Sequence, residues 1–356
     1  MVKIELLSHM PFGSSIFRYG YDIKRSVRLD VSFKYFNFRP SENDRFSKDA
    51  SLDITTISGR KLAETIIELP INYTFRSIVF RNTIKELKQT VRDGGIVHYL
   101  DHLFPPLKEI DPEASVVTLH DAVNKKLNFD SPIYEKQAKR YLNFYRKFDH
   151  VLANSNYVKN ELMNLGFNGK VEVIYYPSSP EFTPIPDKIE LRKKLGLPLD
   201  KKLILSVSTS VRRKNLGTVL ATLNTLGSDY KLVRIGSPLG NAITFAGVSY
   251  ESIAEVYNAC DVLLFPSLEE GFGLPIIEAF ACGLPVVASN IEVFREIANN
   301  AAVLVEPTTK ECVVGIKEAL SGKDTYSKAG MDRSKLFSMV LFGRKMQVYY
   351  ENMIKK

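Results

Sequence analysis

The chain has 356 residues, of which 45% are hydrophobic and 25% charged, and its formal net charge is +8. This is the composition of an ordinary globular protein, and the length favours two domains that each bury their own core. Three isolated cysteines argue against a disulfide framework and a zinc site, and the small charge excess does not indicate nucleic-acid binding. Because no apolar run is long enough for a signal peptide or a membrane span, we expect a cytoplasmic protein, whose basic surface suits peripheral contact with the inner membrane face.

The first half alternates apolar, β-branched runs with helical patterns. Continuous apolar runs are typical of parallel strands that are covered on both faces. Helices are expected over Phe75–Val91 and Pro132–Phe148, the second with a proline in its first turn. The predicted strands are Val2–Leu7, Ile96–Leu100, Ser115–Leu119, Val151–Asn154 and Val171–Tyr175.

A proline-rich stretch, Tyr176–Asp187, follows these elements and contains four prolines in twelve residues. Proline at this density stops both helices and strand ladders, so we place an interdomain linker here. At the far end of the chain, residues 337–356 predict an amphipathic helix that is rich in aromatic residues.

Strand–helix alternation resumes after the linker. It predicts a second doubly wound α/β unit. The expected strands are Leu203–Val207, Lys231–Ile235, Ile243–Ala246, Val262–Pro266, Pro285–Ala288 and Ala302–Val305. The expected helices are Asn215–Leu226, Ser252–Cys260, Pro275–Cys282 and Lys310–Leu320.

The most informative stretch is VLLFPSLEEGFGLPIIEAFACGLPVVASN, residues 262–290. A buried strand ends at Pro266, Pro275 suits the first position of a helix, and Gly283 suits the residue that ends it. The loop between them therefore lies at the carboxyl end of a parallel strand and next to a helix N-terminus. In open α/β sheets this is where ligands bind.

Glycines and carboxylates in this loop predict the kind of ligand. Gly271 and Gly273 permit close approach of the backbone, and free N–H groups at residues 273–276 would attract a phosphate. Glu270 in the loop and Glu278 in the first helical turn can reach the same crevice. Carboxylates accept strong hydrogen bonds from hydroxyl groups, so a phosphorylated, hydroxyl-rich ligand is favoured.

This stretch resembles the signature of the family 4 retaining glycosyltransferases, two glutamates separated by seven residues, here Glu270, GFGLPII and Glu278. The likeness implies the GT-B fold: two doubly wound Rossmann-like α/β domains that face each other across a cleft. It implies an acceptor-binding domain over 1–180, a donor-binding domain over 181–336, and a helix over 337–356 that crosses back to the first domain.

The resemblance also implies roles for the loop. Glu270 would contact the donor sugar and Glu278 the ribose of the nucleotide. The backbone at Gly273, Leu274 and Pro275, beside Gly271, would meet the sugar and phosphates.

A basic cluster, Arg212–Asn215, follows the strand LILSV and resembles the RKN element of the family. A cation here can neutralise the departing pyrophosphate, so Lys214 is assigned that role with Arg213 beside it. Many relatives carry a Gly-Arg pair shortly before the lysine, whereas this chain has Ser208 and Thr209. Some relatives have a Gly-Thr version, so Thr209 is kept as a donor-site residue and Arg213 or Arg212 as the second cation.

Three positions in the first half complete the predicted site. His120, in SVVTLHDA, resembles the family histidine that lines the donor-sugar pocket, and the following Asp121 suits a helix N-cap. His98 also ends a predicted strand and is compatible with the cleft. Relatives commonly show Gly-Gly after the first strand, where this chain offers only Gly13.

The segment Ile16–Arg39 interleaves basic and aromatic residues. An amphipathic helix followed by a strand is the preferred interpretation, membrane contact comes next, and a nucleic-acid platform is the third. The poorly matching first 90 residues leave the acceptor open among glycan, lipid-linked and protein-linked hydroxyls.

A metal-independent retaining reaction is the simplest prediction, because the sequence has no Asp-x-Asp motif or metal cluster and needs no cofactor beyond the nucleotide-sugar substrate. The acceptor would attack on the face from which the nucleoside diphosphate departs. Three alternatives stay open: a non-catalytic partner subunit that binds nucleotide sugar, a GT-B sugar-nucleotide epimerase, and a nucleic-acid-binding protein.

Overall fold

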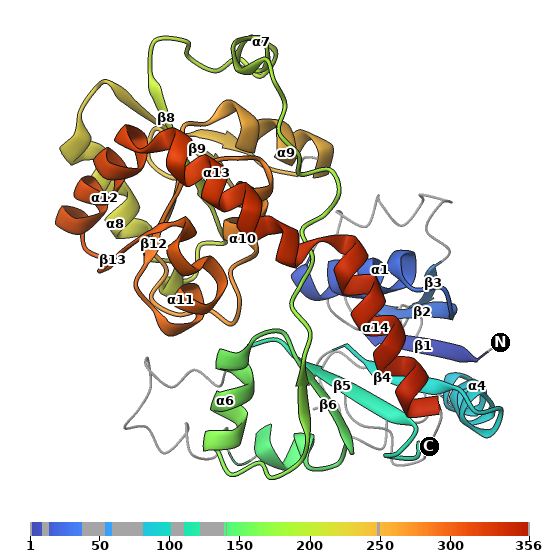
Figure 1. The fold of residues 1–356 in the computed structure, drawn as a ribbon. Helices are drawn as coiled ribbons and strands as arrows, with labels where there is room; N and C mark the ends of the chain where they lie inside the picture. The colour runs from blue at the N-terminus through green and yellow to red at the C-terminus, as the bar shows by residue number, and fades with distance from the viewer. Residues whose placement is uncertain are drawn as a thin grey trace, which may run out of the picture. The chain divides into compact units, whose positions relative to one another are not determined.

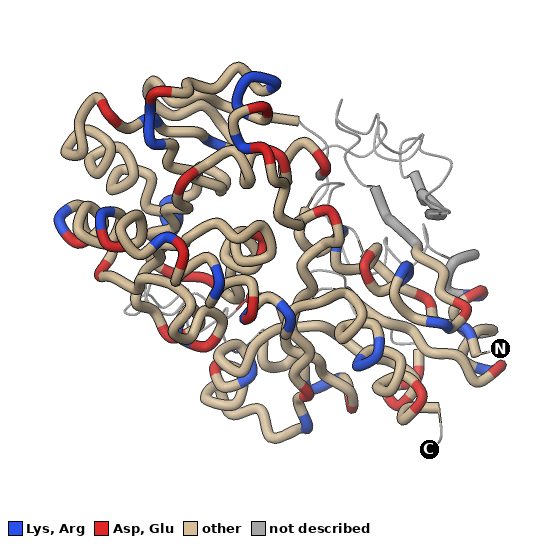
Figure 2. The backbone as a smooth tube through the Cα atoms, turned by 45° about the horizontal axis from the view of Figure 1, so that its top comes forward, with Lys and Arg blue, Asp and Glu red and all other residues tan. Residues whose placement is uncertain are grey.

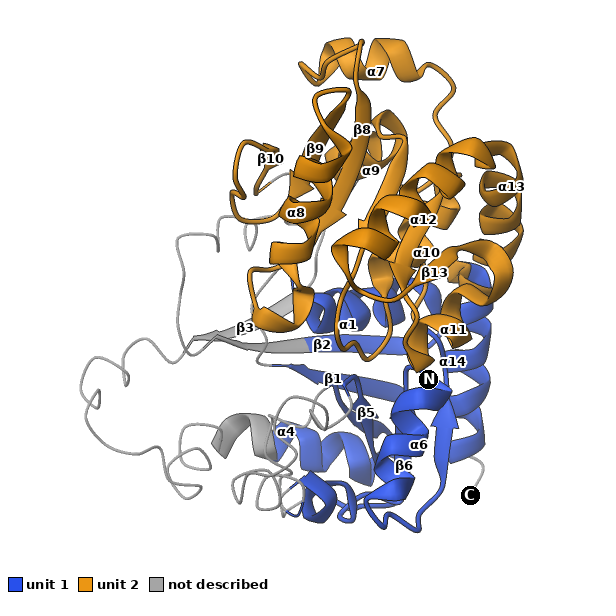
Figure 3. Cartoon of the chain, turned by 90° about the vertical axis from the view of Figure 1, so that its left-hand side faces the viewer, with its two compact units in different colours: residues 1–175, 340–356 blue, residues 176–339 orange. Residues whose placement is uncertain are grey.

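A computed structural model describes residues 2–8, 14–37, 54–58, 81–100, 110–121, 139, 141–247 and 250–354. The chain divides into two compact units, coloured separately in Figure 3. Unit 1 comprises residues 1–175 and 340–356, and unit 2 comprises residues 176–339. The division falls at the start of the proline-rich stretch.

Unit 1 is built on a seven-stranded parallel sheet with the order β3-β2-β1-β4-β5-β6-β7. Its central strands are buried along their whole length, as their apolar sequences predict. The strands are β1 Lys3–Ser8, β2 Asp30–Asn37, β3 Ile54–Ser58, β4 Ile96–Tyr99, β5 Ser115–Leu119, β6 His150–Ala153 and β7 Val171–Val173.

Four helices of unit 1 have defined bounds: α1 Ser15–Ser26, α4 Arg81–Arg92, α6 Asn156–Asn164 and α14 Met339–Ile354. Helix α1 is capped by Ser14, whose hydroxyl oxygen accepts from the N–H of Phe17 at 3.1 Å. It buries Tyr19, whose ring packs edge-on against Phe342 of α14 at 5.7 Å. The C-terminal helix therefore belongs to the core of unit 1 (Figure 1).

Unit 2 is built on a six-stranded parallel sheet with the order β10-β9-β8-β11-β12-β13. The strand order reverses between β8 and β11, which defines the switch point of a doubly wound sheet. The strands are β8 Lys202–Val207, β9 Tyr230–Ile235, β10 Ile243–Phe245, β11 Val262–Phe265, β12 Val286–Ser289 and β13 Val303–Val305.

The helices of unit 2 cover both faces of this sheet. Helices α8 and α12 share one apolar cluster with the strands, while α10 packs on β11 and β12 beside α9, α11 and α13. Their bounds are α7 Lys188–Lys194, α8 Leu216–Leu226, α9 Tyr250–Ala259, α10 Leu274–Ala281, α11 Glu292–Ala298, α12 Thr309–Ser321 and α13 Lys323–Ser334, with 3-10 turns η2 Arg212–Lys214, η3 Asn299–Ala301 and η4 Lys335–Phe337.

The predicted fold class is confirmed, with two parallel sheets flanked by helices. Every predicted strand is present to within two residues, and the aromatic–basic segment forms helix α1 followed by strand β2. The prediction Phe75–Val91 is confirmed over its described part, and residues 141–145 of Pro132–Phe148 are helical. The described residues 146–148 lie in a turn after this helix, so its predicted end was about three residues too late. Residues 75–80, 132–138 and 140 of the two predictions lie outside the described part.

Charge is distributed evenly along the described backbone. Lys and Arg are interspersed with Asp and Glu (Figure 2). Within the described residues, no helix is long and apolar enough to cross a membrane.

Candidate functional site

The glutamate loop, residues 266–273, joins β11 to α10 in unit 2. Its conformation is fixed by Phe272, whose ring packs edge-on against Tyr176 at 5.1 Å and Phe337 at 6.0 Å. Gly273 has a φ of 114°, and a side chain there would lie 2.9 Å from the ring of Phe294. Glycine is therefore required at the last position of the loop.

The basic turn η2 is tied to this loop through main-chain contacts. Leu268 donates its N–H to the carbonyl oxygen of Arg213 at 2.7 Å. Asn215 adopts the left-handed conformation, with φ 53°, and its amide donates to the carbonyl oxygens of Pro266 and Pro307 at 3.2 and 3.1 Å. One asparagine thus holds together the ends of three strands, β8, β11 and β13.

These contacts bring Glu270 against both cations predicted for the site. The carboxylate is 7% exposed, accepts from Arg213 Nη1 at 2.8 Å, and pairs with Lys214 Nζ through its other oxygen. Lys214 also lies over the ring of Phe265, 5.4 Å from its centroid. Two cations against one carboxylate leave the cluster with an excess positive charge. We call Glu270, Arg213 and Lys214 the Glu270 cluster.

Glu278 lies elsewhere on the helix than predicted. It is the fifth residue of α10, so the first-turn placement was wrong. Its side chain is 6% exposed and accepts a hydrogen bond from the hydroxyl of Tyr257 on α9 at 2.7 Å. Tyr257 could not be predicted from the sequence, because its contact with Glu278 depends on how α9 packs against α10.

The N-terminus of α10 offers fewer donors than predicted. Leu274 is the first helical residue, so Pro275 occupies the second position and not the first, and it carries no N–H. Ile276 donates its N–H to the carbonyl oxygen of Gly273 at 3.0 Å. The predicted row of four free N–H groups is therefore reduced to those of Gly273 and Leu274. Gly283 ends the helix with φ 69°, as predicted.

In unit 1, His120 directly follows β5 and is 6% exposed. Its Nε2 pairs with the carbonyl oxygen of Leu100, which can only accept, so this nitrogen carries the proton. The ring of Tyr19 packs edge-on against the imidazole at 5.3 Å. The side chain is thus held in one orientation and one tautomer.

His98, which from the sequence was compatible with a cleft position, is a core residue. It is fully buried, and its two ring nitrogens contact Tyr350 Oη at 2.6 Å and Thr118 Oγ1 at 2.7 Å. Burial and the neighbouring His120 lower the pKa of His98 to about 3. A neutral imidazole with both nitrogens occupied by protein partners serves packing.

The remaining predicted positions differ in their surroundings. Thr209 and Asp121 are exposed, Gly271 is buried, and Gly13 lies outside the described residues. Within the described ranges, no three His, Cys, Asp or Glu side chains are grouped so that they could hold a metal ion.

Two protein families match the chain in consecutive parts. Residues 94–181 match the family described as Glycosyltransferase Family 4, and residues 187–332 match Glycosyl transferases group 1. The second range contains the whole Glu270 cluster and Glu278.

Individual relatives are moderately similar. O-antigen chain mannosyltransferase B of Escherichia coli is 27% identical over 64% of this chain and 67% of its own length. O-antigen chain mannosyltransferase RfbU of Salmonella typhimurium is 28% identical over 46% and 48%. A D-inositol 3-phosphate glycosyltransferase of Stackebrandtia nassauensis is 36% identical over 34% of each chain. The matched part thus spans about two thirds, one half and one third of these relatives.

Solved structures share the fold over the full length. Sucrose-phosphate synthase from Thermosynechococcus elongatus superposes with a TM-score of 0.75 at 20% identity, covering 100% of both chains. Anabaena HepE in complex with UDP and glucose superposes with a TM-score of 0.76 at 16% identity, covering 99% of this chain and 100% of its own.

Proposed function

The chain belongs to the family 4 glycosyltransferases of the GT-B fold, and from this premise we propose that it transfers a sugar from a nucleoside diphosphate sugar to a hydroxyl acceptor, with retention of anomeric configuration. The observation that carries the proposal is the Glu270 cluster. It places two cations and a nearly buried carboxylate at the carboxyl edge of a parallel sheet, beside a helix N-terminus.

The cations meet the main electrostatic need of the reaction. When the bond between the anomeric carbon and the phosphate oxygen breaks, negative charge develops on the leaving diphosphate. Lys214 has two ammonium protons beyond the one directed at Glu270, and we assign them to that charge, with Arg213 beside it. The acceptor oxygen bonds to the anomeric carbon on the same face, and its proton passes to the leaving phosphate oxygen. No metal is required for these steps.

Glu270 has two roles in this scheme. Without donor, its carboxylate pairs with Arg213 and Lys214. When the diphosphate takes over these cations, the carboxylate is left to accept hydrogen bonds from sugar hydroxyls. On donor binding, Arg213 and Lys214 therefore exchange the Glu270 carboxylate for the diphosphate, and Glu270 exchanges the two cations for the sugar hydroxyls.

The other predicted residues complete the donor site. Glu278, held by Tyr257, accepts from the ribose hydroxyls, and the backbone from Gly271 to Pro275 borders the sugar and phosphates. Thr209 borders the diphosphate at the end of β8. We also propose that His120 contacts the transferred sugar, and that Gly13 provides close backbone approach.

The acceptor is proposed to be a glycan or a lipid-linked glycan. Two of the relatives are named as O-antigen chain mannosyltransferases, which supports this choice. An acceptor of this kind would bring the protein to a membrane surface as a peripheral partner.

The test of the function begins with a thermal-shift screen of UDP, GDP, ADP and their sugar conjugates. The sugar conjugate that stabilises the protein is then used as donor. Proton NMR in the presence of EDTA monitors its hydrolysis or the transfer of its sugar. The proposal requires a first-formed product with the anomeric configuration of the donor. An inverted product would exclude the retaining mechanism, and stabilisation without turnover would favour a non-catalytic binding subunit.

A further inference from the structure

Arg234 is a charged residue inside an apolar strand. It lies in β9, in the sequence KLVRIG, and its residue exposure is 0%. Leu232, two positions earlier and therefore on the same face of the sheet, belongs to the apolar core. A guanidinium group is thus placed where the strand pattern calls for an aliphatic side chain.

The partners of this guanidinium are all neutral. Nε donates to the carbonyl oxygen of Ser237 at 2.7 Å, and Nη2 donates to that of Ser208 at 2.7 Å. Nη1 donates to the hydroxyl oxygen of Ser206 at 3.1 Å and lies 3.4 Å from that of Ser208. Within the described residues, no carboxylate forms an ion pair with it.

An unpaired buried charge needs an explanation. Arginine stays protonated in proteins, so its charge is not removed by losing a proton. Burying such a charge without a counter-ion is unfavourable. A bound anion would compensate this charge.

The position of Arg234 shows where that anion would bind. Its partners form the ends of β8 and β9, at the same carboxyl edge of the sheet as the Glu270 cluster. The two strand ends touch at Gly236, where a side chain would lie 2.3 Å from the carbonyl oxygen of Ser208. The chain then runs from Ser208 through the exposed Thr209 into the turn that carries Arg213 and Lys214.

The peptide between Ser208 and Thr209 transmits this charge. In a trans peptide, the carbonyl and the following N–H point in opposite directions. Because Arg234 binds the Ser208 carbonyl oxygen from the buried side, the N–H of Thr209 points away from the core. The positive end of this peptide dipole is therefore presented outward, with a cation behind it.

We propose that Arg234 is a positioning residue that acts through the Ser208–Thr209 peptide and presents the Thr209 N–H to the diphosphate of the donor. The inference rests on the proposed nucleoside diphosphate sugar function, and it adds a main-chain anion donor supported by a buried charge. The neutral nucleoside part of the donor gains nothing from this arrangement.

Calorimetric titrations of UDP and GDP, each beside its parent nucleoside, test the inference. Arg234→Met removes the charge and keeps an unbranched stem. We expect its dissociation constant for the diphosphate that the wild type binds to rise by roughly tenfold or more, with that for the nucleoside unchanged. Arg234→Lys, which restores the charge without the fork, should recover part of the loss.

Two further variants keep the result interpretable. Arg192→Met removes a buried arginine at the opposite edge of the sheet and should leave both dissociation constants unchanged. Thr209→Pro deletes the proposed N–H and should weaken diphosphate binding more than Thr209→Ala, which keeps it.

The inference would be overturned if Arg234→Met lost affinity equally for diphosphate and nucleoside, or for neither. It would also be overturned if the two Thr209 variants changed diphosphate affinity equally. If wild-type protein binds no nucleoside diphosphate at all, the proposed function itself fails.

Discussion

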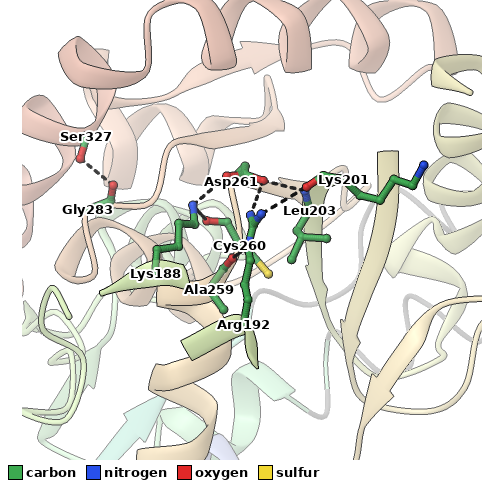
Figure 4. A network of polar contacts seen from close by, with 9 residues as sticks. All are labelled: Lys188, Arg192, Lys201, Leu203, Ala259, Cys260, Asp261, Gly283 and Ser327. Carbon is green, nitrogen blue, oxygen red and sulfur yellow. Dashed lines mark hydrogen bonds and ion pairs between the residues drawn. The ribbon is translucent and has the colours of Figure 1, made fainter. Parts of the chain in front are cut away.

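Unit 2 contains two ionic clusters of the same composition at opposite edges of one sheet. At the amino end of β11, Asp261 pairs with Lys188 at 2.8 Å and Arg192 at 2.6 Å (Figure 4). In the loop that follows the carboxyl end of β11, Glu270 pairs with Lys214 and Arg213. Each cluster has one carboxylate and two cations, and they differ in what else the cations bind.

The cations of the Asp261 cluster also bind main-chain carbonyl oxygens. Arg192 also donates to the carbonyl oxygens of Ala259 and Lys201, and Lys188 donates to that of Cys260. Asp261 accepts in addition from the N–H of Leu203 at 2.7 Å. Burial by itself would raise the pKa of Asp261, but Lys188, the Leu203 N–H and Arg192 outweigh it and lower that pKa. These contacts attach α7 to the sheet.

In the Glu270 cluster, fewer of the N–H donors of the two cations are used by described protein partners. Among the described residues, Lys214 forms an ion pair with Glu270 alone, and Arg213 donates only to Glu270 and the carbonyl oxygen of Glu269. On the proposed function, the same ion pairing contributes to stability where main-chain carbonyls also bind the cations, and to ligand binding where donors remain for a ligand.

The largest effect on stability is expected for Asp261→Ala. Removing the carboxylate leaves two partly buried cations without a counter-ion, which should lower the free energy of unfolding by about 3 kcal/mol. Urea denaturation followed by circular dichroism measures this. Asp332→Ala, which breaks an exposed ion pair with Lys335, is the matched control and should cause no measurable change. Similar midpoints for the two variants would show that the Asp261 cluster is not structural.

Glu270→Gln should have its effect on turnover. Losing the carboxylate should lower kcat by roughly a hundredfold, because the sugar loses a charged acceptor. Affinity for the free nucleoside diphosphate should be kept or increased, because Arg213 and Lys214 lose their competing carboxylate. Steady-state kinetics and calorimetry separate the two effects, with Glu292→Gln on the exposed start of α11 as control. Weaker diphosphate binding would contradict the proposed exchange of partners.

A smaller effect is expected from His98, which should make the free energy of unfolding of unit 1 decrease gradually on acidification. His98 has a pKa of about 3 in the folded state and about 6.5 when unfolded, so the unfolded state binds more protons between these values. Its contribution is complete above pH 6.5 and is lost on acidification toward pH 3, by at most roughly 1.4 kcal/mol per pH unit. The contribution of Asp261 falls only below about pH 4, because its folded pKa is lowered.

Denaturant titrations from pH 7 to pH 4.5 isolate the histidine. His98→Gln should flatten the pH dependence of the unfolding free energy in this range. An unchanged slope would mean that His98 is protonated in the folded protein.

Local rules made much of unit 2 predictable from the sequence. A buried strand, a glycine-rich loop and a helix with an early proline follow one another without interruption, so the loop that carries Glu270 could be placed at a strand end. The Glu270 cluster itself was harder to predict from the sequence. Glu270 and Arg213 are 57 residues apart, and their contact depends on β8 and β11 being neighbours.

Features that depend on packing could not be predicted. His98 lies within one predicted strand and His120 directly follows another, and the contact of His98 with Tyr350 of α14 could not be predicted from the sequence. Tyr257 reaches Glu278 across two helices. Arg234 is visible in the sequence as a charged residue within an apolar strand. That its hydrogen-bond partners are all neutral could be learned only from the structure.

The most direct test of the central claim compares one lysine from each cluster. UDP and GDP are titrated calorimetrically into wild-type protein, Lys214→Ala and Lys188→Ala, at a temperature where all three are folded. Lys214→Ala should raise the dissociation constant of the bound diphosphate by roughly tenfold or more, whereas Lys188→Ala should bind as the wild type does and melt at a lower temperature. Equal affinities in all three proteins would contradict the assignment of the Glu270 cluster to the donor diphosphate.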